Sequence, residues 1–156
     1  MKLGKPLNVA RPRGKDDYGS GEFGASRGDR RHVGLDFAAH FMCPVLAPAS
    51  GHVHLGYCYS DDLSYRYVKI YPHHDNRMFV RLLYVKPFVK QDQFVVIGQT
   101  IGVAQNIALR YGSGMTNHIH VDVALPTGQV LLGKRGEDPG DNVYINPRLV
   151  MEVDDG

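Results

Sequence analysis

Hydrophobic and polar side chains alternate in short runs along most of this chain. Such runs, rich in Val, Ile, Tyr and Phe, are typical of strands with one buried face, and Gly, Pro, Asn and Asp between them favour turns. The pattern predicts strands over Val33–Phe37, Val45–Ala47, His52–Tyr57, Tyr65–Tyr71, Met78–Val85, Phe94–Val96, Thr100–Ala104, Ile119–Ala124 and Val130–Leu132. Residues Asn106–Tyr111 favour a helical turn. Many short strands with few helices indicate an all-β fold, a compact antiparallel sandwich or barrel-like core.

Two of these segments carry side chains that bind metals well. Side chains two or four positions apart on a strand point to the same face, so His32 and Asp36 are expected to share one face of their strand. In the segment 117–123 every second residue is apolar. We therefore expect His118, His120 and Asp122 to line the polar face of that strand. Asp122 either orients a ligand imidazole or is an exposed strand carboxylate.

Two histidines and one carboxylate with an open fourth position are typical of catalytic zinc sites, whereas structural sites are usually closed by four protein ligands. A single histidine is more often a surface or core residue. The combination of the two motifs favours one Zn²⁺ per chain. A second pair, His52 and His54, has no similar carboxylate partner and is not expected to bind metal. His73 and His74 lie in a predicted hairpin turn, where they are either solvated or one of them reaches the site as a further imidazole.

Length and composition limit the protein to one domain and exclude some partners. The 156 residues are 43% hydrophobic, enough for one sizeable core. A net charge of +2 is too small to favour nucleic acid as the main partner. Residues 1–31 are predicted to be an extended lead-in, and Gly133–Asp141 a charged loop. We interpret residues 1–20 as a basic arm and residues 151–156 as an acidic tail, both solvated.

The sequence contains no apolar run long enough for a signal peptide or a membrane span. We therefore expect synthesis in the cytoplasm without a signal peptide, and exit by a route other than signal-dependent export. Cys43 and Cys58 are expected to be reduced structural thiols.

Several ordered motifs resemble the lysostaphin/LytM-type zinc metallopeptidase family. They are Gly21–Gly28, Arg31–Phe37, Pro44–Pro48 with Gly51 and Val53, Gly98–Gly102, His118–Val123 and Asn146–Pro147. The resemblance covers about residues 21–150, which we take as the domain. It implies an antiparallel β fold of the duplicated hybrid motif type and cleavage of peptide cross-links or stem peptides of bacterial peptidoglycan.

The resemblance also implies roles for individual residues. His32, Asp36 and His120 would be the zinc ligands, and His118 would be a catalytic histidine beside the metal. A bound Zn²⁺ lowers the pKa of its water towards ~7. His118 would then accept a proton from that water or donate a hydrogen bond to the tetrahedral intermediate.

One position departs from the family pattern. Where the family carries a second catalytic histidine, this chain has Tyr84, and the surrounding strand resembles that of the leukocyte-derived chemotaxin, a relative regarded as non-catalytic. A phenol can donate a hydrogen bond to an oxyanion without ionising, so Tyr84 either serves as a second catalytic residue or is an ordinary strand aromatic.

Three functions are therefore compatible with the sequence. The first is a zinc endopeptidase acting on peptidoglycan, in the setting of a bacteriophage lysin or a virion-associated enzyme with other virion proteins as partners. The second is a binding module that has kept the zinc site and lost turnover. The third is a structural domain of a virion or envelope.

Overall fold

The computed structural model of the chain describes residues 2–75, 77–126 and 142–155. Its strands are β1 (Lys15–Asp16), β2 (Gly19–Ser20), β3 (Ser26–Arg27), β4 (Arg30–Arg31), β5 (Leu35–Ala38), β6 (Pro44–Leu46), β7 (Gly51–Tyr57), β8 (Arg66–Pro72), β9 (Phe79–Leu83), β10 (Val85–Pro87), β11 (Phe94–Val95), β12 (Thr100–Ala104), β13 (His118–Pro126) and β14 (Asn142–Ile145). The helical segments are α1 (Ala108–Tyr111) and a 3-10 turn, η1 (Pro147–Leu149). The prediction of an all-β fold is confirmed.

The largest sheet has the strand order β11-β7-β8-β9-β13-β14, with β5 also paired to β13, and all its pairs are antiparallel. Side chains alternate between its two faces. On β8, Val68 and Ile70 are fully buried, while Tyr67 and Lys69 point to the opposite face and line a groove. The sheet therefore has one core face and one face that carries the groove.

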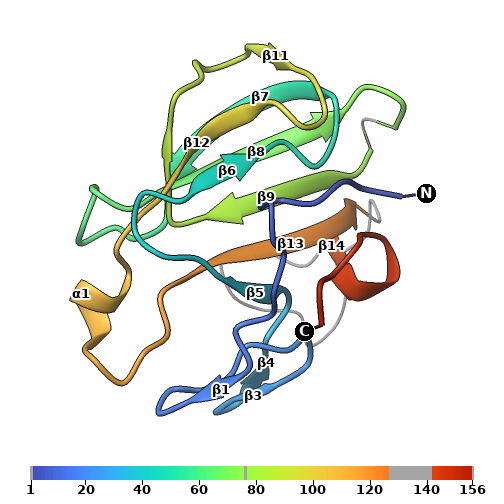
Figure 1. Cartoon of the computed structure of the whole chain (residues 1–156). Helices are drawn as coiled ribbons and strands as arrows, with labels where there is room; N and C mark the ends of the chain where they lie inside the picture. Colours follow the sequence, from blue (N-terminus) through green and yellow to red (C-terminus); the bar gives the residue numbers. More distant parts are fainter. Residues whose placement is uncertain (1, 76, 127–141, 156) are drawn as a thin grey trace.

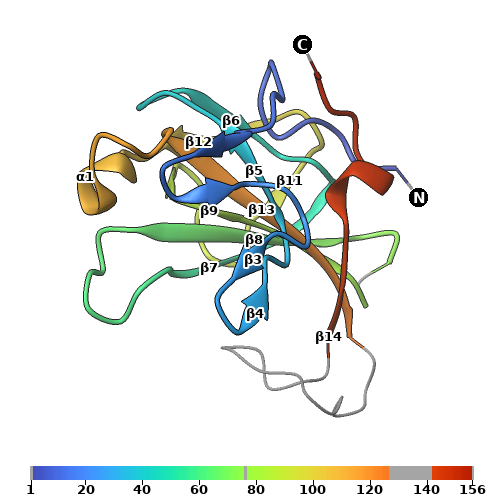
Figure 2. The same cartoon turned by 90° about the horizontal axis from the view of Figure 1, so that it is seen from below.

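A smaller sheet, β10-β12-β6, covers the core face. Figures 1 and 2 show β6 and β12 stacked over β7 and β8 as a separate layer. Buried residues of both sheets, among them Val45, Ile101 and Val121, form one continuous hydrophobic core. The two layers make the sandwich that the hydrophobic pattern predicts.

Most predicted strands are present, with shifted ends. The range Met78–Val85 is two strands, because Tyr84 adopts a φ of 70° and interrupts the run between β9 and β10. The short strand β14 was not predicted. The predicted strand Val130–Leu132 and loop Gly133–Asp141 lie outside the described residues.

The expectation of solvated termini and an irregular lead-in is wrong. Residues 15–31 form two short hairpins, β1-β2 and β3-β4. Leu3 and Leu7 are buried in the core, and Leu3 bridges to Met151 near the other end of the chain. The Nζ of Lys5 lies 3.0 Å from Asp154. Apolar burial and this ion pair attach the N-terminal residues to the C-terminal ones. The domain boundaries at residues 21 and 150 stay a prediction.

Among the described residues, no helix has the length and apolar character required to cross a membrane.

Candidate metal centre

Strand β13 supplies the centre of the site. Its residues Ile119, Val121 and Val123 are fully buried in the core, as the alternating pattern predicts. His118, His120 and Asp122 therefore lie on the groove face. Strand β5 pairs with β13 in a register that sets Asp36 opposite His120. This pairing brings together two residues that are 84 positions apart in sequence.

His32 reaches the same place from a loop. The sequence predicts a strand from Val33, but β5 begins only at Leu35, and His32 lies between β4 and β5. The assignment of His32 to the face of a strand is therefore wrong, although it does lie beside Asp36. At Gly34 a Cβ atom would collide with the carbonyl oxygen of Val121 and the ring of His120. Only glycine allows the loop to pass this close to β13.

Three donor atoms converge in this site. The Nδ1 of His120 lies 3.0 Å from Oδ1 of Asp36 and 3.0 Å from Nε2 of His32. The Nε2 of His32 lies 3.3 Å from the same Oδ1. Tetrahedral ligands at the bond lengths usual for zinc are about 3.3 Å apart. The spacing and chemistry of His32, Asp36 and His120 therefore fit a zinc ion with an open fourth position.

The two histidines are held in the tautomers that metal binding requires. Because a carbonyl oxygen only accepts, Nδ1–H of His32 donates to the carbonyl of Glu22, at 2.9 Å, and leaves Nε2 free as a ligand atom. Nε2–H of His120 donates to Oδ2 of Asp122, at 3.0 Å, so Nδ1 is the nitrogen that a metal ion would bind. Asp122 in turn accepts from Arg81 at 2.9 Å. Carboxylate and carbonyl partners of this type orient metal-binding histidines.

Asp122 is fully buried, so it orients His120 and is not an exposed strand carboxylate. Burial alone would lower the pKa of His120, but its hydrogen bonds to Asp122 and Asp36 raise it to about 9. Burial would raise the pKa of Asp36, but His120 and His32 beside it hold that pKa well below its usual range. Without a metal, His120 also carries a proton on Nδ1, facing Asp36, and a metal ion would displace this proton.

His118 lies next to the three candidate ligand atoms, and only its Nε2 is turned towards them. Its Nδ1–H donates to the carbonyl of Thr116 at 2.8 Å, and its Nε2 lies 3.6 Å from Oδ2 of Asp36. Burial lowers its pKa, which favours the neutral imidazole near pH 7. His118 therefore presents a free lone pair on Nε2 and can act as a proton acceptor.

Tyr84 lies beside His118, with 5.6 Å between their ring centroids. Its hydroxyl accepts a hydrogen bond from Tyr59 at 3.4 Å. Burial raises the pKa of the Tyr84 phenol, so it stays protonated at neutral pH and can donate a hydrogen bond. The structure thus places all five predicted site residues in one groove: His32, Asp36, Tyr84, His118 and His120.

This groove has a volume of about 1400 Å³ and is lined by polar and apolar groups. Arginines of the β3-β4 hairpin line it, among them Arg27, and so do tyrosines, among them Tyr18, Tyr59 and Tyr111. A groove of this size accommodates an extended peptide better than a small molecule.

Sequence reasoning missed two functional candidates, Arg13 and Tyr59. Arg13 donates a hydrogen bond to Asp36 at 2.9 Å from a segment with no hydrophobic periodicity. Tyr59 contacts Tyr84 from the loop between β7 and β8. No spacing rule connects either residue to its partner.

The other histidines do not form a comparable cluster. His52 packs against Phe94, and His54 is within 3.0 Å of the amide of Gln91. His73 and His74 lie 6.0 Å apart, between ring centroids. Within the described ranges, a single group of three His, Cys, Asp or Glu side chains is close enough to hold one metal ion, namely His32, Asp36 and His120.

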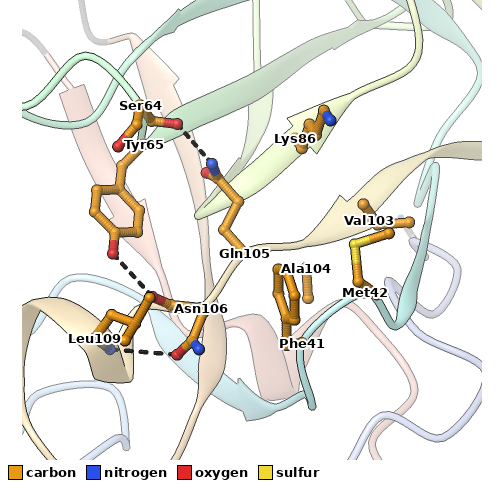
Figure 3. A pocket seen from close by; sticks show the side chains of 10 residues that line it. All are labelled: Phe41, Met42, Ser64, Tyr65, Lys86, Val103, Ala104, Gln105, Asn106 and Leu109. Carbon is orange, nitrogen blue, oxygen red and sulfur yellow. Dashed lines mark hydrogen bonds between the residues drawn. The ribbon is translucent and has the colours of Figure 1, made fainter.

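A smaller hollow of about 260 Å³ is lined mainly by apolar side chains, including Phe41, Met42 and Leu109 (Figure 3). Tyr65 also lines it and donates to the carbonyl of Asn106 at 2.8 Å (Figure 3). None of the three candidate metal ligands lines this hollow.

Several solved structures have a fold similar to that of this chain. The antimicrobial peptidase lysostaphin from Staphylococcus simulans matches with a TM-score of 0.62 and 17% identity over 96% of this chain and 53% of its own. A zinc-containing peptidase from Vibrio cholerae matches with a TM-score of 0.56 and 23% identity, over 79% of this chain and 36% of its own. The catalytic domain of the prophage-encoded M23 protein EnpA from Enterococcus faecalis matches with a TM-score of 0.53 and 20% identity. The match covers 81% of this chain and 85% of that domain.

No family model matches the sequence, and no curated protein matches it. The chain spans about a third to a half of several solved chains that it matches, including Csd3 of Helicobacter pylori, of which it covers 34%. The class that the fold defines is the lysostaphin-type β fold. The predicted resemblance to the lysostaphin/LytM-type family is confirmed at the level of the fold.

Proposed function

We propose that this protein is a zinc-dependent endopeptidase that hydrolyses peptide cross-links or stem peptides of bacterial peptidoglycan. The observation that carries the proposal is the convergence of His32, Asp36 and His120 in a groove, with the free nitrogen of His118 beside them. The peptidases that share this fold support it. A prophage-encoded neighbour supports a lysin or virion-associated setting, in which other virion proteins would be partners.

The residues of the groove have distinct chemical tasks in this proposal. A zinc ion bound by the three ligands would supply a Lewis acid and a water of lowered pKa. His118 accepts the proton of the attacking water at Nε2, because its Nδ1–H is already engaged with Thr116. The hydroxyl of Tyr84 donates a hydrogen bond to the oxyanion that develops on the scissile carbonyl.

The test is release of new free amines from purified peptidoglycan by the zinc-loaded protein. His120→Ala and a chelator-treated sample are the controls, and circular dichroism establishes that the variant is folded. We expect cleavage by the wild type and loss of cleavage in both controls. Equal cleavage by folded His120→Ala would contradict the proposal. Absence of cleavage on several wall chemistries, with one zinc bound per chain, would favour a binding module.

A further inference from the structure

Arg13 is a charged side chain buried beneath the groove, next to Asp36. It lies shortly before β1, in the segment that the sequence predicts to be a solvated arm, yet its side chain is only 2% exposed. Burial of an unpaired guanidinium is costly, so its partners must compensate for the lost hydration. Those partners are two carboxylates, Asp36 and Asp16.

The two carboxylate oxygens of Asp36 face different partners. Nη1 of Arg13 donates to Oδ2 at 2.9 Å. The other oxygen, Oδ1, faces Nδ1 of His120 at 3.0 Å and Nε2 of His32 at 3.3 Å. Arg13 therefore occupies the side of the carboxylate away from the two histidine donor atoms and leaves Oδ1 available to a metal ion.

The main chain holds the same two residues together. The amide of Arg13 donates to the carbonyl of Asp36 at 2.7 Å, and the amide of Asp36 donates to the carbonyl of Gly21 at 2.9 Å. A Cβ on Gly21 would lie 2.9 Å from Cβ of Asp36 and 3.1 Å from Cβ of Arg13. This close packing leaves the Asp36 side chain little freedom to turn.

The second carboxylate connects Arg13 to His118. Asp16 accepts from Nη2 and Nε of Arg13 at 2.6 and 2.8 Å, a two-pronged contact that fixes the guanidinium plane. Asp16 also accepts from the amide of Thr116 at 2.8 Å. The carbonyl of Thr116 accepts the Nδ1–H of His118. One buried network thus joins a metal-binding carboxylate to the proposed catalytic histidine.

We propose that Arg13 is a positioning residue for the metal site: it fixes Asp36 so that Oδ1 alone is presented with His32 and His120. The inference rests on the proposed zinc function and adds a residue from the N-terminal segment to it. Arg13 acts through Asp36, because its buried side chain has almost no surface to offer a substrate. Partners that orient metal ligands typically change metal affinity by about 10- to 100-fold when removed.

Arginine, rather than lysine, suits this place. Its planar fork bonds Asp36 through one nitrogen and Asp16 through the two others at the same time. A lysine ammonium keeps the charge but cannot reproduce this planar geometry. Arg13→Lys is therefore expected to lie between the wild type and Arg13→Gln.

The experiment measures zinc affinity by competition with a chromophoric chelator, for the wild type, Arg13→Gln and Arg13→Lys. Lys5→Met is the matched control, because Lys5 also attaches the N-terminal segment but pairs with Asp154, outside the metal site. Absorption spectra of the cobalt-loaded proteins report ligand geometry independently of activity. Thermal unfolding in excess chelator measures the stability of each metal-free fold.

We expect zinc affinity to fall about 10- to 100-fold in Arg13→Gln, less in Arg13→Lys, and not in Lys5→Met, with a changed cobalt spectrum in Arg13→Gln. If Arg13→Gln does not fold, Asp16→Asn replaces it, because it weakens the other end of the network, and a smaller loss of affinity is expected. Unchanged or tighter zinc binding by folded Arg13→Gln, or by folded Asp16→Asn where it replaces Arg13→Gln, would overturn the inference. Failure of the wild type to bind zinc would instead overturn the proposed function.

Discussion

The rings of Tyr84 and His118 meet edge-on, with centroids 5.6 Å apart and an interplanar angle of 85°. The contact depends on the backbone at Tyr84, where a φ of 70° ends β9 and turns the side chain out of the regular alternation. Left-handed backbone is uncommon for a bulky residue and costs about 1 kcal/mol or more. We therefore expect this tyrosine to have a functional role that offsets the cost of its backbone conformation.

Removal of the Tyr84 hydroxyl is expected to reduce turnover. Loss of one donor to a developing oxyanion typically lowers kcat by about 10²- to 10³-fold. We therefore expect Tyr84→Phe to lower kcat by that order with little change in KM, since the ring that packs on His118 remains. The measurement is steady-state cleavage of a soluble peptidoglycan fragment.

Tyr84→His is the matched comparison, because it inserts the side chain that the resemblance to the lysostaphin/LytM-type family predicts at this position. We expect this variant to be active without a large gain over the wild type. A large gain, together with no effect of Tyr84→Phe, would mean that the tyrosine is a lapsed catalytic position.

Asp122→Asn is expected to weaken zinc binding. The carboxylate accepts Nε2–H of His120 and is itself held by Arg81, so it fixes the ring that presents Nδ1 to the metal. Loss of its charge should lower zinc affinity by about 10- to 100-fold. Chelator competition measures this, with Asp154→Asn, a carboxylate variant far from the site in sequence, as the control. Equal affinities for the two variants would contradict the expected role.

The sequence alone predicts the sandwich and the β13 face well, because strand alternation is a local signal. Ile119 and Val121 point into the core, so His118 and His120 must point to the opposite face, which carries the groove. The His32 position was predicted from the wrong geometry. The position of His32 depends on a loop that passes close to β13 at Gly34. A side chain at Gly34 would collide with β13, and this contact is visible only in the folded structure.

Arg13 shows the limit of sequence reasoning more clearly. An arginine in a segment rich in Gly, Arg, Lys and Asp has no periodicity that distinguishes a buried residue from a solvated one. Its burial follows from two carboxylates, one of them 23 positions away, that meet only when the chain is folded. Long-range ion pairs of this kind leave no pattern in a single sequence.

Acid should destabilise the metal-free protein partly through Asp16. Hydrogen bonds from Arg13 hold the pKa of Asp16 below its ordinary value. Asp16 therefore contributes stability that is complete above the unfolded pKa, about 3.9, and is lost as the pH falls through the folded pKa. We expect the free energy of unfolding to fall less steeply between about pH 5 and pH 2 in Asp16→Asn than in the wild type. Denaturant titrations in excess chelator measure the slopes, and parallel slopes would contradict the expectation.

Tyr59 is expected to support Tyr84 through its hydroxyl. The Tyr59 hydroxyl donates to that of Tyr84, and the Arg110 guanidinium carbon lies 3.7 Å above the Tyr59 ring. Because the Tyr84 hydroxyl oxygen accepts this hydrogen bond, its own O–H points in another direction. We expect it to donate to a substrate oxygen. A hydrogen bond of this kind contributes about 1 kcal/mol, so Tyr59→Phe should lower kcat about five-fold.

Tyr65→Phe is the matched control for Tyr59→Phe. Tyr65 belongs to the same aromatic cluster, but its hydroxyl donates to the carbonyl of Asn106 and not to Tyr84. We expect Tyr65→Phe to affect stability more than kcat. In a Tyr84→Phe background, Tyr59→Phe should cause no further loss, because the hydroxyl that it supports is already gone. A five-fold loss that persists in that background would show that Tyr59 acts on the reaction by another route.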